Sequence, residues 1–218
     1  MTGCKGDLLW ESPAVPAVRF EQTVQSIFRF CPGAALIALT LASAPAGEIH
    51  KIDGAQSSVT FAIHQFLGTT HGKFSQVSGT VEIDRAHPER SLVRAVIAVK
   101  SIDTGIAKRD EHLRSPSLFD VAKYPQIIFK SRSVKQTGPQ TADILGDLTM
   151  HGVTRPITLH VKALAPLKET INPTPMRWSV HPDLIRRSDF GLLFSRTAEA
   201  ISGIGAEVTI EMSITTKK

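Results

Sequence analysis

Gly146–Val161, with the sequence GDLTMHGVTRPITLHV, contains the pattern that decides the fold. Before its central turn, apolar or small residues alternate with polar ones, and after the turn the apolar residues alternate again. Such a period of two is typical of a β-strand with one apolar face. His151–Pro156 lies between the two runs, where Gly152 can take the positive φ that a tight connection requires. We therefore predict a hairpin whose polar residues serve the turn and the outer face, in preference to a catalytic or metal site.

The same alternation continues on both sides of this hairpin. It is clearest in Ser58–His64 and in Glu207–Ile214, where every second residue is apolar. One helical segment is expected within Thr104–Val121, with Ser115 as a cap and Pro116 at the first helical position of its second half. About eight antiparallel strands leave unpaired edges unless the sheet closes. We predict an all-β protein, a single antiparallel β-barrel of about eight strands with one short helical segment. The remaining expected strands are Gly79–Asp84, Leu92–Lys100, Gln126–Ser131, Ile144–Met150, Ile157–Lys162 and Met176–His181.

The N-terminal region has the features of an export signal. Pro32–Ala46 is a short apolar run that ends in small residues, Ala44-Pro45-Ala46, and Arg29 precedes it. We expect residues 1–46 to be an N-terminal extension and a cleavable signal peptide, with cleavage after Ala46, and residues 47–218 to be one domain. A retained membrane anchor is the alternative, although the run is shorter than the roughly 20 residues of a spanning helix. Both cysteines, Cys4 and Cys31, belong to the removed part.

Composition narrows the classes of function. The formal net charge is +5, but the basic residues are scattered, so no nucleic-acid partner is expected. A basic exported protein can favour anionic lipids or anionic head groups. The histidines show neither H-x-H nor H-E-x-x-H spacing, and no G-x-S-x-G motif occurs, so we expect no metal site and no serine nucleophile.

A resemblance adds to these expectations. The chain resembles the YceI-like family of exported, lipocalin-like polyisoprenoid-binding proteins from about Ile49 to Thr216. This resemblance implies a periplasmic β-barrel with a long apolar cavity for an isoprenoid quinone or a polyprenyl lipid, no other cofactor and no enzymatic activity. The motifs that carry it are, in order, Ile52-Asp53, Ser58-Val59-Thr60-Phe61, Gly72-Lys73-Phe74, Gly79-Thr80-Val81, Ser101–Gly105, Arg109–Pro116, Phe119-Asp120-Val121, Tyr124-Pro125, Phe129-Lys130-Ser131, the hairpin above and Arg187–Gly191.

Alternation and the resemblance together select the side chains that would line the cavity. Each of them is equally compatible with simple core packing, because small barrels are commonly filled. Phe119 and Phe190 are candidate lids at the mouth. Polar candidates for a head group are Arg109, Asp110, His112, Arg187 and Asp189, since arginine pairs well with phosphate oxygens. The expected lumen residues are Val59, Phe61, Ile63, Val81, Ile83, Phe119, Ile127, Phe129, Ile144, Leu148, Trp178, Phe190, Val208 and Ile210.

Three alternatives stay open from the sequence. Asp103, Asp110 and Asp189 would support acid–base chemistry if they converge, which would make the protein an exported enzyme. A carrier that docks on a membrane redox or lipid-modifying partner differs from a plain binder only in having an exposed docking patch. A homodimer is compatible with the fold, although no particular residue supports it.

Overall fold

The computed structural model describes residues 47–164, 175–194 and 203–218. Ala44–Lys218 forms a compact unit of its own, and the expected signal peptide lies outside the described residues. No helix of the described part is long and apolar enough to cross a membrane. The elements are β1 (Glu48–Ile52), β2 (Ser58–Gln65), β3 (Gly68–Phe74), β4 (Val77–Ile83), β5 (Leu92–Ala98), β6 (Ile102–Asp103), α1 (Ala107–Arg114), β7 (Gln126–Gly138), β8 (Thr141–Met150), β9 (Val153–Ala163), β10 (Met176–Pro182), β11 (Ile185–Arg186) and β12 (Glu207–Lys217).

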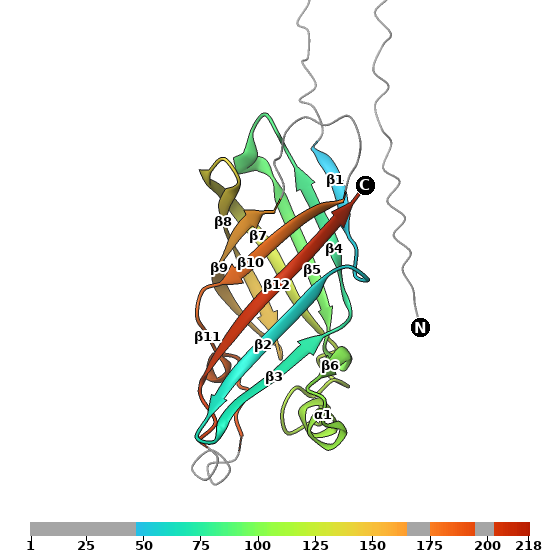
Figure 1. The fold of residues 1–218 in the computed structure, drawn as a ribbon, viewed down its shortest axis with the longest axis vertical. Helices are drawn as coiled ribbons and strands as arrows, with labels where there is room; N and C mark the ends of the chain where they lie inside the picture. Colours follow the sequence, from blue (N-terminus) through green and yellow to red (C-terminus); the bar gives the residue numbers. More distant parts are fainter. Residues whose placement is uncertain (1–46, 165–174, 195–202) are drawn as a thin grey trace, which may run out of the picture. The chain divides into compact units, whose positions relative to one another are not determined.

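All strand pairs are antiparallel, and the sheet closes on itself (Figure 1). β12 pairs with β10 along one edge. Along its other edge it pairs with β1 near its end and with β2 over its first half. The result is a closed barrel of eight strands, as the alternation predicted.

Three of the barrel strands are bent at the same level. β1 continues into β2, β3 into β4, and β5 into β6: β1 and β2 both pair with β12, and the β3–β4 strand pairs with β1–β2 on one side and with β5–β6 on the other. The bends hydrogen-bond to each other: the amide of Ser75 donates to the carbonyl of Ser101 at 3.3 Å, and the amide of Ala98 donates to that of Gln76 at 3.0 Å. These bonds satisfy backbone groups that a bend would otherwise leave unpaired.

The hairpin of β8 and β9 is tighter than predicted. Met150 pairs directly with Val153, so the connection is only His151 and Gly152, and both have positive φ (51° and 75°). This is the geometry of a type I′ turn, whose twist matches that of the flanking strands. The prediction that the histidine serves a turn is confirmed. Its Nδ1 lies 3.1 Å from the carbonyl oxygen of Phe190, which attaches the turn to the neighbouring loop.

The predicted helical segment exists, but its predicted start signal was wrong. α1 ends at Arg114, and Ser115 is its C-cap with extended φ and ψ. Pro116 explains this end, because a proline disfavours the helical region for the residue before it. Turns follow in place of a second helix: the amides of Leu118 and Asp120 both donate to the carbonyl of Ser115. The segment covers the end of the barrel next to β6 (Figure 1).

Candidate ligand-binding lumen

The interior of the barrel contains two adjoining cavities. The helix-side chamber, about 160 Å³, lies at the end covered by α1, where Leu113, Leu118 and Phe119 contribute to its wall. The turn-side chamber, about 370 Å³, extends to the β4–β5 and β7–β8 connections at the other end. Because some side chains line both, the two chambers adjoin within the barrel, and we call them together the lumen. The shared residues are Val59, Ala95, Ile97, Phe129, Leu159 and Met212.

Nearly every residue expected in the lumen lies on its wall. The exception is Phe190, which is buried in the core cluster but lines neither chamber. Contact with a ligand stays a prediction for all of them. The helix-side wall contains Phe61, Ile63, Phe119, Ile127, Leu148, Val208 and Ile210; the turn-side wall contains Val81, Ile83, Ile144 and Trp178; Val59 and Phe129 belong to both.

Two glycines let aromatic rings lie against the barrel wall. Gly72 is paired with Phe61 across β2 and β3, and a Cβ built on Gly72 would lie 2.2 Å from Cζ of that ring. A Cβ on Gly146 would lie 2.4 Å from Cζ of Phe129. Each ring therefore occupies the space of the missing side chain. This arrangement keeps phenylalanine bulk out of the lumen centre.

Polar side chains occur at the mouth of the turn-side chamber. Asp84, Arg85, Ser91 and Gln136 lie among its lining residues. The Nε of Arg85 is 3.5 Å from Oε1 of Glu48 on β1. Hydrogen bonding from this guanidinium is the main reason why the pKa of Glu48 is below its ordinary value. The apolar tunnel thus has a charged, solvent-facing rim at this end.

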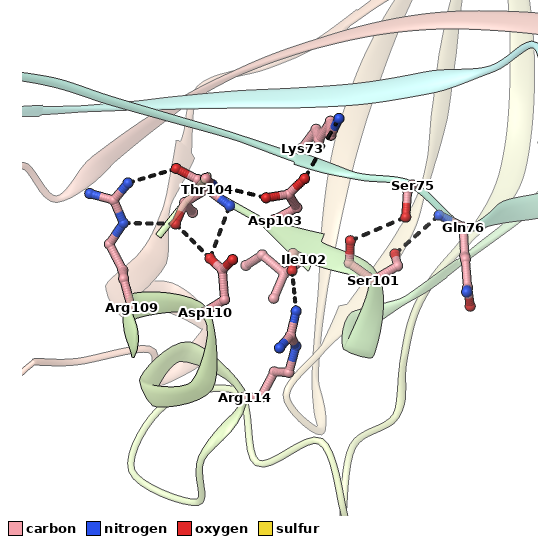
Figure 2. A network of polar contacts seen from close by, with 11 residues as sticks. Lys73, Ser75, Gln76, Ser101, Ile102, Asp103, Thr104, Arg109, Asp110 and Arg114 are labelled. Carbon is pink, nitrogen blue, oxygen red and sulfur yellow. Dashed lines mark hydrogen bonds and ion pairs between the residues drawn. The ribbon is translucent and has the colours of Figure 1, made fainter. Parts of the chain in front are cut away.

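At the helix end, Arg109 and Asp110 bind the chain itself (Figure 2). Asp110 is buried, and its Oδ1 accepts hydrogen bonds from the amide of Thr104 at 2.9 Å and from the Thr104 hydroxyl at 2.5 Å. Arg109 donates to the same hydroxyl at 2.7 Å and to the Thr104 carbonyl at 2.8 Å. Arg114 donates to the carbonyls of Ile102 and Lys100. We call Thr104, Arg109, Asp110 and Arg114 the α1 clamp, because they hold the helix on β6.

The other head-group candidates are spread over the same end. Arg187 is buried and lines the helix-side chamber, where it donates to the carbonyls of Leu192 (2.9 Å) and Gly205 (3.0 Å). Its guanidinium lies 5.2 Å from the centre of the Phe194 ring, and the His112 ring lies 6.5 Å from the same ring. Asp189 is exposed. The structure therefore joins Arg187 and His112 through Phe194, but it does not bring the five candidates into one cluster.

The carboxylates proposed for the enzyme alternative also make structural contacts. Asp103 accepts from the amide of Gly105 at 2.9 Å and pairs with Lys73 at 3.6 Å. The amide of Gly105, followed by Lys73, lowers the pKa of Asp103. Asp110 is engaged in the α1 clamp. Among the described residues, no group of three or more histidine, cysteine, aspartate or glutamate side chains has the arrangement of a metal site.

Comparison with known proteins fits the barrel and its motifs. A family model described as YceI-like domain matches residues 50–216. The chain belongs to the YceI-like domain family. The resemblance inferred from the motifs is thereby confirmed.

Relatives of this YceI-like chain occur in several bacteria. A "UPF0312 protein" of Pseudomonas savastanoi is 40% identical over 136 residues, covering 62% of this chain and 70% of its own. "Protein YceI" of Salmonella arizonae is 42% identical over 134 residues, covering 60% and 69%. The structure of Burkholderia cenocepacia BcnA matches with a TM-score of 0.65 and 24% identity, covering 75% of this chain and 98% of its own. A polyisoprenoid binding domain from Saccharophagus degradans matches with a TM-score of 0.57 and 20% identity, covering 77% and 97%. These two structural likenesses establish the common fold.

Several lumen residues of this YceI-like barrel were missed from the sequence. Val93, Ala95 and Ile97 occupy every second position of β5, so their period was a usable signal. Met212 continues the face of Val208 and Ile210. By contrast, the lining residues from α1 and from the connections have no strand period to follow. Those are Leu113, Leu118, Leu192 and Phe194.

Proposed function

We propose that this protein binds an isoprenoid lipid, a quinone or a polyprenyl phosphate, in its lumen, and that it acts as a binding or carrier protein and not as an enzyme. The observation that carries the proposal is the elongated apolar lumen formed by the two adjoining chambers, whose lining is apolar apart from Arg187 at the helix end and the polar rim at the turn-side end. The structural likeness to the polyisoprenoid binding domain from Saccharophagus degradans agrees with it.

The chemistry of the wall suits a long, repetitive hydrocarbon. Burial contributes about 0.8 kcal/mol per CH₂, so one isoprene unit of about five carbons contributes roughly 3–4 kcal/mol before ordering costs. A wall of aliphatic and phenylalanine side chains makes no directional demand on the tail. Affinity then depends mainly on tail length, and a head group needs only a polar environment.

The location is also a proposal. The signal-like segment before Gly47 supports export to the periplasm with cleavage after Ala46. An exported carrier meets isoprenoid lipids at a membrane surface. N-terminal sequencing of the protein recovered from the periplasm tests this: a chain that begins at Gly47 is expected, and a chain recovered only from the cytoplasm contradicts the proposal.

The function itself is tested by what the protein carries. Residues 47–218, with an export signal, are purified from a bacterial periplasm without detergent, and a solvent extract is analysed by mass spectrometry. We expect an isoprenoid lipid in stoichiometric amount. The matched variants are Ala95→Phe, which places a ring where both chambers meet, and Val96→Phe, which places the same ring on the opposite face of β5.

The two variants separate a lumen site from a surface site. Ala95→Phe should lose the lipid while Val96→Phe retains it, provided that both show the cooperative melting of the parent. Retention of lipid by a folded Ala95→Phe variant would contradict the lumen site. A parent protein that is empty and takes up no added isoprenoid would contradict the proposed function.

A further inference from the structure

The turn between β2 and β3 exposes two large apolar side chains. Phe66 and Leu67 form this two-residue turn, between the paired residues Gln65 and Gly68. Phe66 is 76% exposed and Leu67 is 102% exposed. Hairpin tips are ordinarily polar, because their side chains meet water. This tip therefore carries apolar surface that the barrel does not use.

The choice of residues does not serve the turn either. Neither Phe66 nor Leu67 is among the residues with positive φ, so this is not the favoured type I′ geometry. In the same protein His151 and Gly152 do form that geometry. A local departure from turn chemistry that leaves both side chains mostly exposed indicates selection for something other than folding.

More apolar surface lies around the same end of the barrel. Figure 1 shows the β2–β3 turn and α1 at this end. Ile106, which precedes α1, and Leu193 are each more than half exposed. Leu193 lies between two residues that line the helix-side chamber, Leu192 and Phe194. Leu193 thus directly follows and precedes residues of the lumen wall.

The contacts of the tip hold it in place relative to this wall. A Cβ built on Gly203 would lie 2.4 Å from the Phe66 ring, so the ring packs directly on that glycine. Nη1 of Arg109 reaches the Thr70 hydroxyl at 3.4 Å, which connects β3 to α1. Lys108, exposed on the first turn of α1, adds a positive charge beside Ile106.

We propose that this end of the barrel docks on the surface of a lipid bilayer, with Phe66 and Leu67 inserted between the lipids and the helix-side chamber facing the membrane. The direction of the lumen toward the bilayer rests on the proposed function; the insertion of the tip does not. A bilayer fits this surface better than a protein partner. A stable protein interface needs about 800 Å² from each side, whereas a tip of two side chains is a narrow projection. Apolar side chains with a neighbouring cation are what a headgroup region accepts.

The experiment is a vesicle flotation assay with residues 47–218, the compact unit described above. Vesicles of phosphatidylethanolamine and phosphatidylglycerol are compared with vesicles of phosphatidylcholine. We expect the parent to float with the vesicles, more strongly with the anionic ones, and Phe66→Ser/Leu67→Ser to bind at least about ten-fold less. The matched control is Ile49→Ser/Leu92→Ser, which removes two exposed apolar side chains from β1 and β5, the strands on either side of β4, at the other end of the barrel and should leave binding unchanged.

The outcomes distinguish this proposal from the proposed function, because each preparation is also extracted for lipid. A protein that carries an isoprenoid but ignores vesicles, or whose Phe66→Ser/Leu67→Ser variant floats like the parent, overturns the docking proposal alone. A protein that carries nothing but floats through this tip overturns the function alone. If size-exclusion chromatography shows that the variant converts a dimer to a monomer without a change in flotation, the tip is a contact between copies and docking is overturned.

Discussion

Replacing Gly72 by alanine should test how the lumen is kept open. In the structure an alanine Cβ at this position would lie 2.2 Å from Cζ of Phe61 and within 2.8 Å of two other ring carbons. Tolerable contact begins at about 3.4 Å, so the ring has to retreat by about 1.2 Å. The backbone is not among the atoms in conflict, so the ring must move. Phe61 lines the helix-side chamber, and the retreat is into it.

Two opposing terms set the expected change in stability. Overpacking of this kind costs about 1–3 kcal/mol. Removing a glycine from the interior of a strand stabilises by about 0.5–1 kcal/mol, because the unfolded chain loses freedom. We expect Gly72→Ala to lower the free energy of unfolding by about 1–2 kcal/mol. In a Phe61→Leu background the ring is absent, and the same substitution should be neutral or slightly stabilising.

Ligand binding should change in the same direction. If the displaced ring takes the place of one or two CH₂ groups of the bound tail, about 0.8–1.6 kcal/mol is lost, which is roughly a four- to fifteen-fold weaker affinity. Trp178 lines the turn-side chamber and is the only tryptophan of residues 47–218, so quenching of its fluorescence by a short-chain quinone reports binding. Urea unfolding followed by the same fluorescence completes a double-mutant cycle. Equal effects of Gly72→Ala with and without the Phe61 ring would refute the proposed packing.

Three further outcomes follow from single contacts. Asp110→Ala removes a buried acceptor of two hydrogen bonds and should cost about 2–3 kcal/mol in urea unfolding, whereas Glu111→Ala on the exposed face of α1 should change stability by less than about 0.5 kcal/mol. Gly152→Ala combines a φ of +75° with a Cβ 2.7 Å from the Tyr124 ring, so we expect a loss of at least about 1 kcal/mol and faster unfolding in stopped-flow traces. His160 has a raised pKa because its ring hydrogen-bonds to Asp143 and Asp183, so its stabilising effect should be complete below pH 6.5, the ordinary pKa, and disappear as the pH rises through the raised value. The effect is small because His160 and its aspartate partners are exposed. Unfolding curves of His160→Gln, recorded across this pH range, should lack this pH dependence. A variant whose stability changes with pH in the same way as the parent would contradict the assignment to His160.

The alternation in the sequence predicted those strands of the barrel that carry an apolar face of their own. β12 and β2 alternate in burial as their sequences do. β3 was missed, and the pairing explains why. Its inward positions are Thr70, Gly72 and Phe74, opposite Ile63, Phe61 and Val59. The bulk on this part of the wall comes from the neighbouring strand, so β3 itself shows no apolar period. In β3 alternation fails because Thr70 and Gly72 supply little bulk of their own, whereas in β8 the neighbours of Gly146, Ile144 and Leu148, keep the period visible.

The polar motifs were harder to interpret for a different reason. Arg109 and Asp110 stand next to each other in a charged run, which suggested a head-group site, but the structure directs both at Thr104. Sequence alone shows which side chains are able to bind a ligand's head group or the protein's own backbone. It does not show which of these two partners lies within reach of the side chain. The buried Arg187, which donates to carbonyls of its own loop, is a second case.

A hollow barrel explains why such residues are needed. At the helix end, the hydrogen-bonded pairing of the wall is interrupted, because β5 pairs with β7 whereas β6, which continues β5, pairs with β3. α1 and the turns that follow it cover this part of the wall. In a filled barrel, core packing would hold that cover in place. Here Leu113, Leu118 and Phe119 face a cavity, and each unfilled neighbour means lost dispersion contacts. Hydrogen bonds of the α1 clamp, made to backbone groups of β6 and the adjacent loop, supply the attachment that packing does not. The polar motif and the cavity therefore belong together at this end of the barrel: the α1 clamp fixes the cover where side-chain packing around the cavity is sparse.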